Sequence, residues 1–383
     1  MFESVIALIR DLYPAQTTIP LHEPRFQGRE REYVLAAIDS TFVSSVGAFV
    51  DRLEAEVVRY TGTAQAVATV NGTAALHIAL LLAGVQPGDE VITQPLTFVA
   101  TANAIAYCGA TPVFVDVDRR CAGLSPEALA AFLDQETRRQ DGVLLNRSSG
   151  RRIAACLPVH TFGLPAAIER LVATCAEHGL PVVEDAAEAL GSTWQGRHCG
   201  TFGLLGIYSL NGNKTITAGG GGIIVTSDPV LARQAKHLTT TAKRLHPYLY
   251  DHDALGYNYR MPNLNAALAC AQLEQLEAFV AAKRTVAARY QAFFATSGLT
   301  FLEEPAGGRA NCWLNSILLP DRAARDLFLA ETHRAGILTR PAWRLLNELP
   351  MYRSCRHDGL ANARWLADRL VNLPSSVPAG ARP

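Results

Sequence analysis

Lys214 lies in a polar, glycine-rich loop between two apolar runs of the sequence. Residues 204–208 and the β-branched run 223–226 predict the flanking strands, and the glycines 219–222 follow the lysine. Rigid elements on both sides can hold a lysine amine partly out of water, where its unprotonated form attacks a carbonyl to give a Schiff base. A loop lysine taken alone is far more often solvated, so the other residues must decide between these interpretations.

Two polar motifs follow other predicted strands. Asn71-Gly72-Thr73 comes after an apolar run and opens a helix, so backbone N–H groups and the helix N-terminus could bind a phosphate. The simpler interpretation is that Thr73 only caps this helix. Asp185 ends an apolar strand, where a buried carboxylate needs a cation or hydrogen-bond donors. A protonated pyridine nitrogen would be such a partner, and helix N-capping is the alternative.

Four more residues near these motifs could contact a flat, phosphorylated cofactor. Glu188 follows Asp185 by three residues, on the same face of a predicted helical turn, where it could equally be a capping carboxylate. Phe98 could stack on a ring, although an aromatic residue there is more often part of the core. Ser209 could donate its hydroxyl to a phosphate, and Asn258 lies in a polar segment at a predicted domain boundary, where it could also be an ordinary turn residue.

One cofactor, pyridoxal 5′-phosphate (PLP), needs all of these groups together. It requires a lysine amine, an acid beside the pyridine nitrogen, a phosphate cup and a stacking ring. The chain presents them in the order cup, ring, acid, serine and lysine. Each signal is weak by itself, but their conjunction predicts a PLP enzyme.

A P-loop NTPase is the competing prediction from another class, because Asn213-Lys214-Thr215 follows a strand. The P-loop motif needs a glycine directly before the lysine and another glycine five residues earlier. The chain has Asn213 and Tyr208 at those positions. Binding of PLP rather than of Mg-ATP would discriminate the two.

The elements expected to position these residues alternate between strands and helices over the first two-thirds of the chain. This alternation predicts an α/β fold with a mostly parallel sheet covered by helices on both faces. Beyond about residue 261 the pattern changes to a long amphipathic helix at 263–294 and short elements, which predicts a smaller α+β domain. We therefore expect an N-terminal helical segment at 1–20, a large domain at 21–260 and a small domain at 261–383.

The composition argues against several classes of function. Lys plus Arg equals Asp plus Glu at 35 each, so no basic face is expected to attract nucleic acid. The chain has no apolar run of about 18 residues, which predicts no transmembrane helix, and its N-terminus lacks a signal peptide's basic region. Eight scattered cysteines and ten dispersed histidines predict neither disulfides nor a metal site, which is typical of a cytoplasmic protein.

The chain resembles the DegT/DnrJ/EryC1/StrS sugar aminotransferases, a family within the fold-type-I PLP enzymes. This resemblance extends over about 19–374 and implies a seven-stranded sheet in the large domain. It is carried by Asn71-Gly72-Thr73-Ala74-Ala75-Leu76, Thr97-Phe98-Val99-Ala100-Thr101, Glu184-Asp185-Ala186-Ala187-Glu188-Ala189, Ser209-Leu210-Asn211-Gly212-Asn213-Lys214 and Gly256-Tyr257-Asn258-Tyr259-Arg260-Met261.

The resemblance implies a role for each candidate residue. Lys214 would bind PLP covalently and carry a proton between cofactor and substrate carbons, while Asp185 would hold the pyridinium. Asn258 would reach the phosphate bound by the neighbouring subunit, so the active unit would be a homodimer. The remaining contacts would come from Phe98 and Glu188 to the ring, and from Gly72, Thr73 and Ser209 to the phosphate.

Within the family, the chain is most similar to LegC-type enzymes. These transfer the amine of L-glutamate to C4 of a UDP-linked 4-keto-6-deoxy-N-acetylhexosamine, in pathways to bacterial surface sugars such as legionaminic acid. The alternative substrate is a GDP- or dTDP-linked 4-keto-6-deoxyhexose of the perosamine type. The finer resemblance is carried by Leu21-His22-Glu23-Pro24-Arg25-Phe26, Ser40-Thr41-Phe42-Val43-Ser44-Ser45-Val46-Gly47, Gln94-Pro95-Leu96-Thr97-Phe98, Asn311-Cys312-Trp313-Leu314-Asn315 and Arg340-Pro341-Ala342-Trp343.

Trp313, Arg340 and Trp343 are the candidates for the nucleotide-sugar site. Aromatic faces suit sugar rings and uracil, and a guanidinium suits anionic groups. The two tryptophans could equally belong to the core or to an interface.

Overall fold

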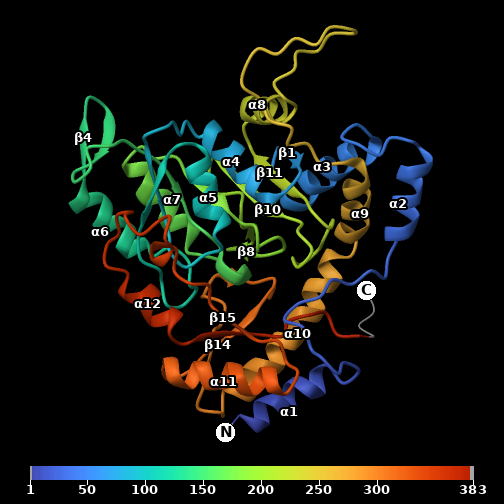
Figure 1. Cartoon of the computed structure of the whole chain (residues 1–383), viewed down its shortest axis with the longest axis vertical. Helices are drawn as coiled ribbons and strands as arrows, with labels where there is room; N and C mark the ends of the chain where they lie inside the picture. The colour runs from blue at the N-terminus through green and yellow to red at the C-terminus, as the bar shows by residue number, and fades with distance from the viewer. Residues whose placement is uncertain (1, 380–383) are drawn as a thin grey trace.

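A sheet of seven strands forms the centre of the larger of two bodies in the computed structural model, which describes residues 2–379 (Figure 1). The strands lie in the order β1 (Gln65–Thr69), β11 (Gly222–Thr226), β10 (Leu205–Ser209), β7 (Val183–Asp185), β6 (Ile153–Leu157), β2 (Glu90–Thr93) and β3 (Thr111–Phe114). Parallel bridges Cys156–Val182 and Val159–Asp185 join β6 to β7. The pairs β10–β7, β2–β3 and β2–β6 are parallel, whereas β11 is antiparallel to β1 and β10. This confirms the predicted mostly parallel, seven-stranded sheet.

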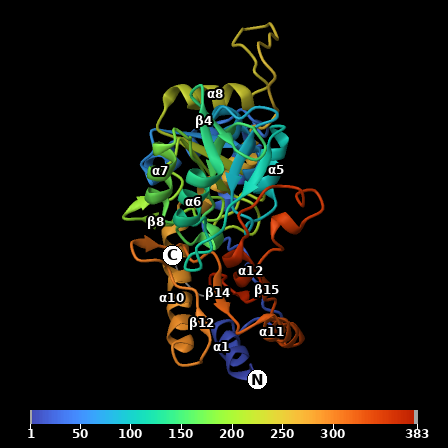
Figure 2. The same cartoon turned by 90° about the vertical axis from the view of Figure 1, so that its left-hand side faces the viewer.

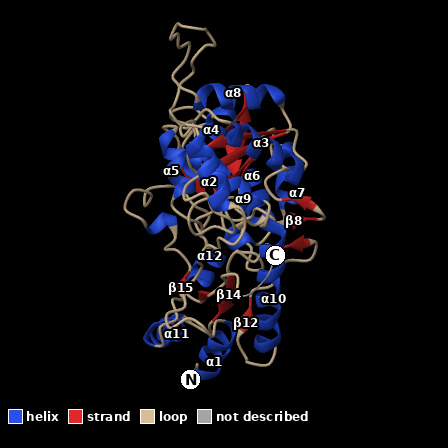
Figure 3. Ribbon diagram, turned by 90° about the vertical axis from the view of Figure 1, so that its right-hand side faces the viewer, coloured by secondary structure: helices blue, strands red, loops and turns tan. Residues whose placement is uncertain are grey.

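Helices cover both faces of this sheet (Figure 3). One face packs against α4 (Gly72–Leu82), α5 (Ala100–Tyr107) and α8 (Pro229–Thr239). The other packs against α3 (Ala48–Thr61), α6 (Pro126–Glu136), α7 (Ile168–Glu177) and α9 (Asn263–Leu273). Val67 and Ile224 belong to the first apolar layer, and their neighbours Ala68 and Ile223 belong to the second. Because successive side chains of a strand point to opposite faces, burial on both faces explains the continuous apolar runs in the sequence.

The smaller body is built on a second sheet, below the first in Figure 2. Its strand order is β12 (Thr300–Phe301), β14 (Asn315–Leu318), β16 (Leu370–Leu373) and β15 (Arg340–Pro341). The helices around it are α1 (Glu3–Leu12), α10 (Leu276–Phe294), α11 (Arg322–Arg334) and α12 (Ala361–Ala367). Apolar residues of α1, α10 and α11 share one buried cluster with β14 and β16. The second, smaller α+β unit is therefore confirmed, and α1 packs within it.

The single helix predicted at 263–294 is wrong, because the chain forms α9 and α10 with Glu274 and Gln275 between them. A buried contact with α2 (Glu30–Asp39) lies at this break. Gln272 and Gln275 each donate a side-chain hydrogen bond of 2.7 Å to Glu30 Oε1. Buried carboxylates need such donors, and the pairing holds both glutamines at the break between the two helices. α9 then packs on α2 and α3 of the larger body. The predicted domain boundaries at 20/21 and 260/261 stay predictions.

Residues 243–255, called the arm below, project beyond α8 (Figures 1 and 2). The Lys243–His252 bridge closes the arm at its base. Its exposed large apolar or aromatic side chains are Leu245, Tyr248, Leu249, Tyr250 and Leu255. Among residues 2–379, none of the helices has the length and apolar character that crossing a membrane requires.

The remaining short elements lie between these main ones. They are β4 (Thr137–Gln140), β5 (Val143–Asn146), η1 (Thr161–Gly163), β8 (Thr193–Trp194), β9 (Arg197–His198), β13 (Gly308–Arg309) and η2 (Leu346–Glu348).

Candidate active site

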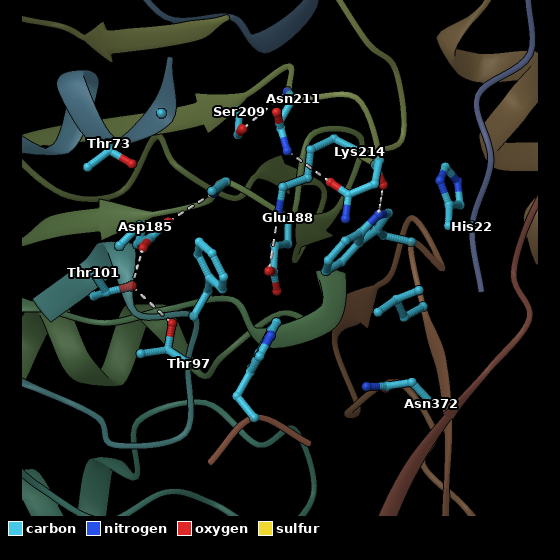
Figure 4. A pocket seen from close by; sticks show the side chains of 18 of the residues that line it. His22, Thr73, Thr97, Thr101, Asp185, Glu188, Ser209, Asn211, Lys214 and Asn372 are labelled. Atoms are coloured by element: carbon cyan, nitrogen blue, oxygen red, sulfur yellow. Dashed lines mark hydrogen bonds and ion pairs between the residues drawn. The ribbon is translucent and has the colours of Figure 1, made fainter. Parts of the chain in front are cut away.

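A cavity of about 700 Å³ lies where the carboxyl ends of the large-body strands face the smaller body (Figure 4). Open parallel sheets bind ligands at this edge. The loops after β1, β2, β7 and β10 form one wall, and β15, β16 and the segment before β14 form the other. The predicted site residues that line the cavity are Gly72, Thr73, Phe98, Asp185, Glu188, Ser209, Lys214, Trp313, Arg340 and Trp343.

The N-terminus of α4 and the end of β10 meet to form a small cup. Asn71 caps α4 by accepting a 2.8 Å hydrogen bond from the Ala74 backbone N–H, so the expectation that Thr73 is the cap is wrong. A Cβ added to Gly72 would lie 3.1 Å from the Ser209 Cβ, so only glycine permits this close approach without a shift. The first N–H groups of a helix lack intrahelical partners, and its dipole favours an anion there. The cup therefore suits a phosphate.

Asp185 is the buried acid of the cavity. Its side chain accepts hydrogen bonds from Thr101 Oγ1 at 2.8 Å and from the Ala187 N–H at 3.1 Å. Thr97 in turn lies 3.0 Å from the Thr101 hydroxyl. Burial raises the pKa of the Asp185 carboxyl, while the Thr101 and Ala187 donors and the charge of Lys214 act in the opposite direction. A cation placed against this carboxylate would offset its burial.

The alternative interpretation of Asp185 and Glu188 as helix-capping residues is wrong. Residues 186–192 form turns rather than the helix that the sequence favoured. The Ala187 N–H therefore belongs to a tight turn at the end of β7, and Glu188 extends from that turn into the cavity. Thr101 was missed as a functional residue, although it lies in the same polar segment as Phe98.

Lys214 is held by contacts from both bodies. Its Nζ lies 3.2 Å from Glu188 Oε1 and 4.1 Å from the centroid of the Trp313 ring. Trp313 also donates a 2.6 Å hydrogen bond from Nε1 to the Asn213 carbonyl, next to the lysine. The other oxygen of Glu188 accepts a 2.8 Å bond from the Phe162 N–H. Burial raises the pKa of Glu188, and the adjacent lysine opposes this.

Phe98 belongs to the cavity wall and not to the core. Its side chain is 52% exposed, and its ring centroid lies 6.3 Å from that of Trp343. Trp343 stacks on Phe162 at 4.8 Å, so it is anchored from behind while it lines the cavity. Trp313 is buried at 3% exposure, yet it borders the cavity. Both tryptophans therefore combine a packing role with a position at the site.

The smaller body contributes two residues that the sequence did not single out individually, His22 and Asn372. Burial lowers the pKa of His22 well below its usual range, and the nearby charges of Lys283 and Lys214 add to this. Asn372 lies within β16, and an amide inside an otherwise apolar strand was the available signal. Figure 4 places both on the side of the cavity away from Asp185.

Asn258 does not line the cavity of its own chain. It is exposed, and its Oδ1 accepts a 3.3 Å hydrogen bond from Arg260 Nη2. Its predicted contact with the cofactor of a neighbouring subunit stays a prediction.

The arrangement fits PLP on observations independent of the sequence motifs. The cup offers backbone N–H groups and the Ser209 hydroxyl. A side chain at Gly72 would intrude on Ser209 there. Asp185 is 3% exposed and has no cationic side-chain partner within salt-bridge distance in the described part of the chain. Lys214 and the exposed Phe98 line the same cavity. Phosphate, pyridinium, aldehyde and ring face therefore each have a counterpart.

Comparison with known proteins gives the same picture. Residues 24–379 match the model of the DegT/DnrJ/EryC1/StrS aminotransferase family. The chain is 37% identical to a GDP-perosamine synthase of Escherichia coli O157:H7 over 93% of each chain, and 36% identical to one of Caulobacter vibrioides, again over 93% of each. It superposes on the aminotransferase TlmJ from Streptoalloteichus hindustanus with a TM-score of 0.84 and 28% identity, covering 94% of this chain and 93% of that one.

Proposed function

The chain belongs to the DegT/DnrJ/EryC1/StrS aminotransferase family and is a PLP-dependent enzyme, and from this premise we propose that it transfers the amine of L-glutamate to C4 of a nucleotide-linked 4-keto-6-deoxyhexose for bacterial surface-sugar biosynthesis. One observation carries the proposal. A single cavity holds the amine of Lys214, the buried carboxylate of Asp185 and the cup at Gly72 and Ser209.

The chain's own residues divide the work of this reaction. When bound, PLP supplies the electron sink that lets an amine move between carbon skeletons. Lys214 Nζ holds and moves the proton, and the Glu188 carboxylate at 3.2 Å and the Trp313 ring at 4.1 Å fix its position. Asp185 holds the proton of the pyridine nitrogen, and Thr101 orients Asp185. Phe98 and Trp343 line one side of the cavity with aromatic rings.

The nucleotide is the finer part of the proposal. The similarity to GDP-perosamine synthases supports a GDP-linked sugar, which was the alternative prediction from the sequence. A UDP-linked 4-keto-6-deoxy-N-acetylhexosamine is the second candidate. The segments that carry the LegC-type resemblance reach the cavity through His22, Trp313 and Arg340, so this sugar is kept in the test.

A panel of nucleotide-linked 4-keto-6-deoxy sugars tests the proposal. Purified enzyme with PLP and L-glutamate is given the GDP-, dTDP- and UDP-linked sugars, and 2-oxoglutarate and the amino sugar are measured by mass spectrometry. We expect both products in equal amounts with the GDP-linked sugar. Preference for the UDP-linked N-acetyl sugar would establish the second candidate, and no sugar-dependent 2-oxoglutarate with any donor would reject the function.

The proposal includes a homodimer as the active unit. The exposed apolar side chains of the arm, and those of residues 35–46 on α2 and the segment after it, support a protein interface, because monomers rarely expose such surfaces. The exposed Asn258, which follows the arm, is then available to a neighbouring cavity.

A further inference from the structure

One face of the small-body sheet presents three polar side chains side by side. Asn372 of β16 pairs in register with Ser316 of β14 and with Arg340 of β15. Residues directly opposite one another in neighbouring strands point to the same face of a sheet. Asn372 and Arg340 line the cavity, and Ser316 stands behind Asn372.

The Asn372 amide is oriented with its donors toward the cavity. Its Oδ1 accepts a 2.6 Å hydrogen bond from Ser316 Oγ. Its side chain is only 3% exposed, and within residues 2–379 no partner is found for its Nδ2. Figure 4 shows this nitrogen directed into the cavity. A buried amide that gives up donor bonds loses stability, so a ligand acceptor is the natural partner for these hydrogens.

Arg340 adds a positive charge beside this amide. Its Nη1 lies 3.2 Å from the Thr339 carbonyl and 3.0 Å from His333 Nε2, and no described carboxylate pairs with it. The acids of the cavity, Asp185 and Glu188, hold other partners, Thr101 and Lys214 respectively. The Asn372–Arg340 pair therefore presents only hydrogen-bond donors and a cation. Guanidinium and amide donors together match the oxygens of a carboxylate or a phosphate.

We propose that Asn372 and Arg340 form an anion subsite that binds carboxylate or phosphate oxygens of a substrate, with Ser316 as the residue that positions Asn372. This inference rests on the proposed function, which supplies two sources of such oxygens. They are the carboxylate of the amino donor and the diphosphate of the nucleotide sugar.

Equilibrium binding to the holoenzyme tests the subsite independently of turnover. Titration calorimetry measures the affinity for glutarate, a dicarboxylate with neither amine nor ketone, and for GDP and UDP. Asn372→Ala removes a donor pair to a charged group, and we expect an affinity loss of roughly tenfold to a hundredfold. Arg340→Gln lies at an exposed position, so a loss of several-fold is expected. The matched control is Arg344→Gln, an exposed arginine near Glu348 that does not line the cavity.

The outcomes distinguish the source of the anion. Loss confined to glutarate assigns the subsite to the amino donor, and loss confined to GDP or UDP assigns it to the diphosphate. Wild-type affinity of both variants for all three probes, or no binding of any probe by the wild type, overturns the proposal. Failure of the proposed function would instead show as a wild type that binds these probes but aminates no sugar.

Two further variants separate orientation from folding. Asn372→Asp keeps the shape of the side chain and can still accept from Ser316, but it replaces the donors with a negative charge. It should weaken binding of the affected probe more than Asn372→Ala does. Ser316→Ala should weaken binding less than either, because Asn372 remains but is no longer held. The cofactor absorbance and melting temperature of each variant show that it is folded, and an Asn372→Asp enzyme that bound anions as well as the wild type would contradict the assignment.

Discussion

Trp313 shows how a single side chain links the two bodies at the amine of Lys214. Its ring faces Lys214 Nζ at 4.1 Å, and its Nε1 holds the backbone of Asn213. A cation over an indole face is stabilised electrostatically. The lysine is thus fixed by an ion pair with Glu188 from the larger body and by an aromatic face from the smaller one. The position of the Lys214 amine therefore depends on how the two bodies lie relative to each other.

Replacement of Lys214 tests the centre of the site. Lys214→Ala removes the only amine placed beside Glu188 in the described cavity, so the covalent cofactor absorbance should disappear and turnover should fall by at least roughly 10²- to 10⁴-fold. Absorbance spectra and steady-state rates measure this. The control is Lys236→Ala, which alters a surface lysine paired with Glu54. Normal turnover by the Lys214 variant would reject the assignment.

Asp185→Asn probes the charge on the acid without changing its shape. The amide oxygen can still accept from the Ala187 N–H, and the amide nitrogen that replaces Oδ2 can donate to the Thr101 hydroxyl, so folding should be intact. The pyridinium would lose its counter-ion, so we expect weaker PLP binding and a large fall in rate. Dialysis against cofactor-free buffer followed by titration with PLP gives the affinity. Wild-type kinetics in this variant would show that the carboxylate does not act on the cofactor.

At the scale of elements, the turn from β1 into α4 decides whether the phosphate cup exists. Asn71 has extended backbone angles and caps the helix, which leaves the Gly72 and Thr73 N–H groups at the open end. Gly72 then brings that end against Ser209 of β10. The geometry of the cup therefore depends on α4 together with the strands β1 and β10.

The identity of the cap can be tested by a matched pair of variants. Asn71→Ala should lower the free energy of unfolding by about 1 kcal/mol, as loss of an N-cap does. Thr73→Ala should cost less stability, because Thr73 lies in the first turn of α4 and is not its cap. Denaturant unfolding of the enzyme freed of cofactor measures both. A larger loss for Thr73→Ala than for Asn71→Ala would contradict the observed capping.

At the scale of the whole molecule, the arm and Asn258 are the parts of the chain that we expect to contact a second copy. The arm projects away from the cavity of its own chain and exposes Leu245, Tyr248 and Tyr250. Asn258 follows directly and is also exposed. In a two-fold symmetric dimer, the arm and Asn258 of each chain would lie in the same position relative to the cavity of the other chain.

Complementation between two inactive variants tests the shared site. If Asn258 acts across the interface, a mixed dimer of Lys214→Ala and Asn258→Asp chains has one site that keeps both residues and one site that lacks both. About half of the dimers in an equal mixture are mixed, so the mixture should recover roughly a quarter of wild-type activity. Each variant alone should be nearly inactive, because the new carboxylate would repel a phosphate. Light scattering establishes the oligomeric state. If the mixture recovers no activity although mixed dimers form, Asn258 does not act in trans.

The sequence by itself determined the class of fold, the cofactor and ten of the residues that line the cavity. Continuous apolar runs predict strands buried on both faces, and the polar residues after those runs must gather at one sheet edge. That is why Gly72, Asp185, Ser209 and Lys214, which line one cavity, could be selected from the order of residues alone. These signals are local, since each depends on residues close together in the chain.

Only the tertiary structure decided the features that depend on distant segments. Buried Glu30 accepts hydrogen bonds from Gln272 and Gln275 where the chain breaks between α9 and α10, although the apolar pattern there continues. Thr101 becomes a partner of Asp185 across 84 positions of sequence. Asn372 and Arg340 meet through strand register, which pairs β16 with β15. Contacts of this kind are set by the packing of whole elements, and no short stretch of sequence encodes them.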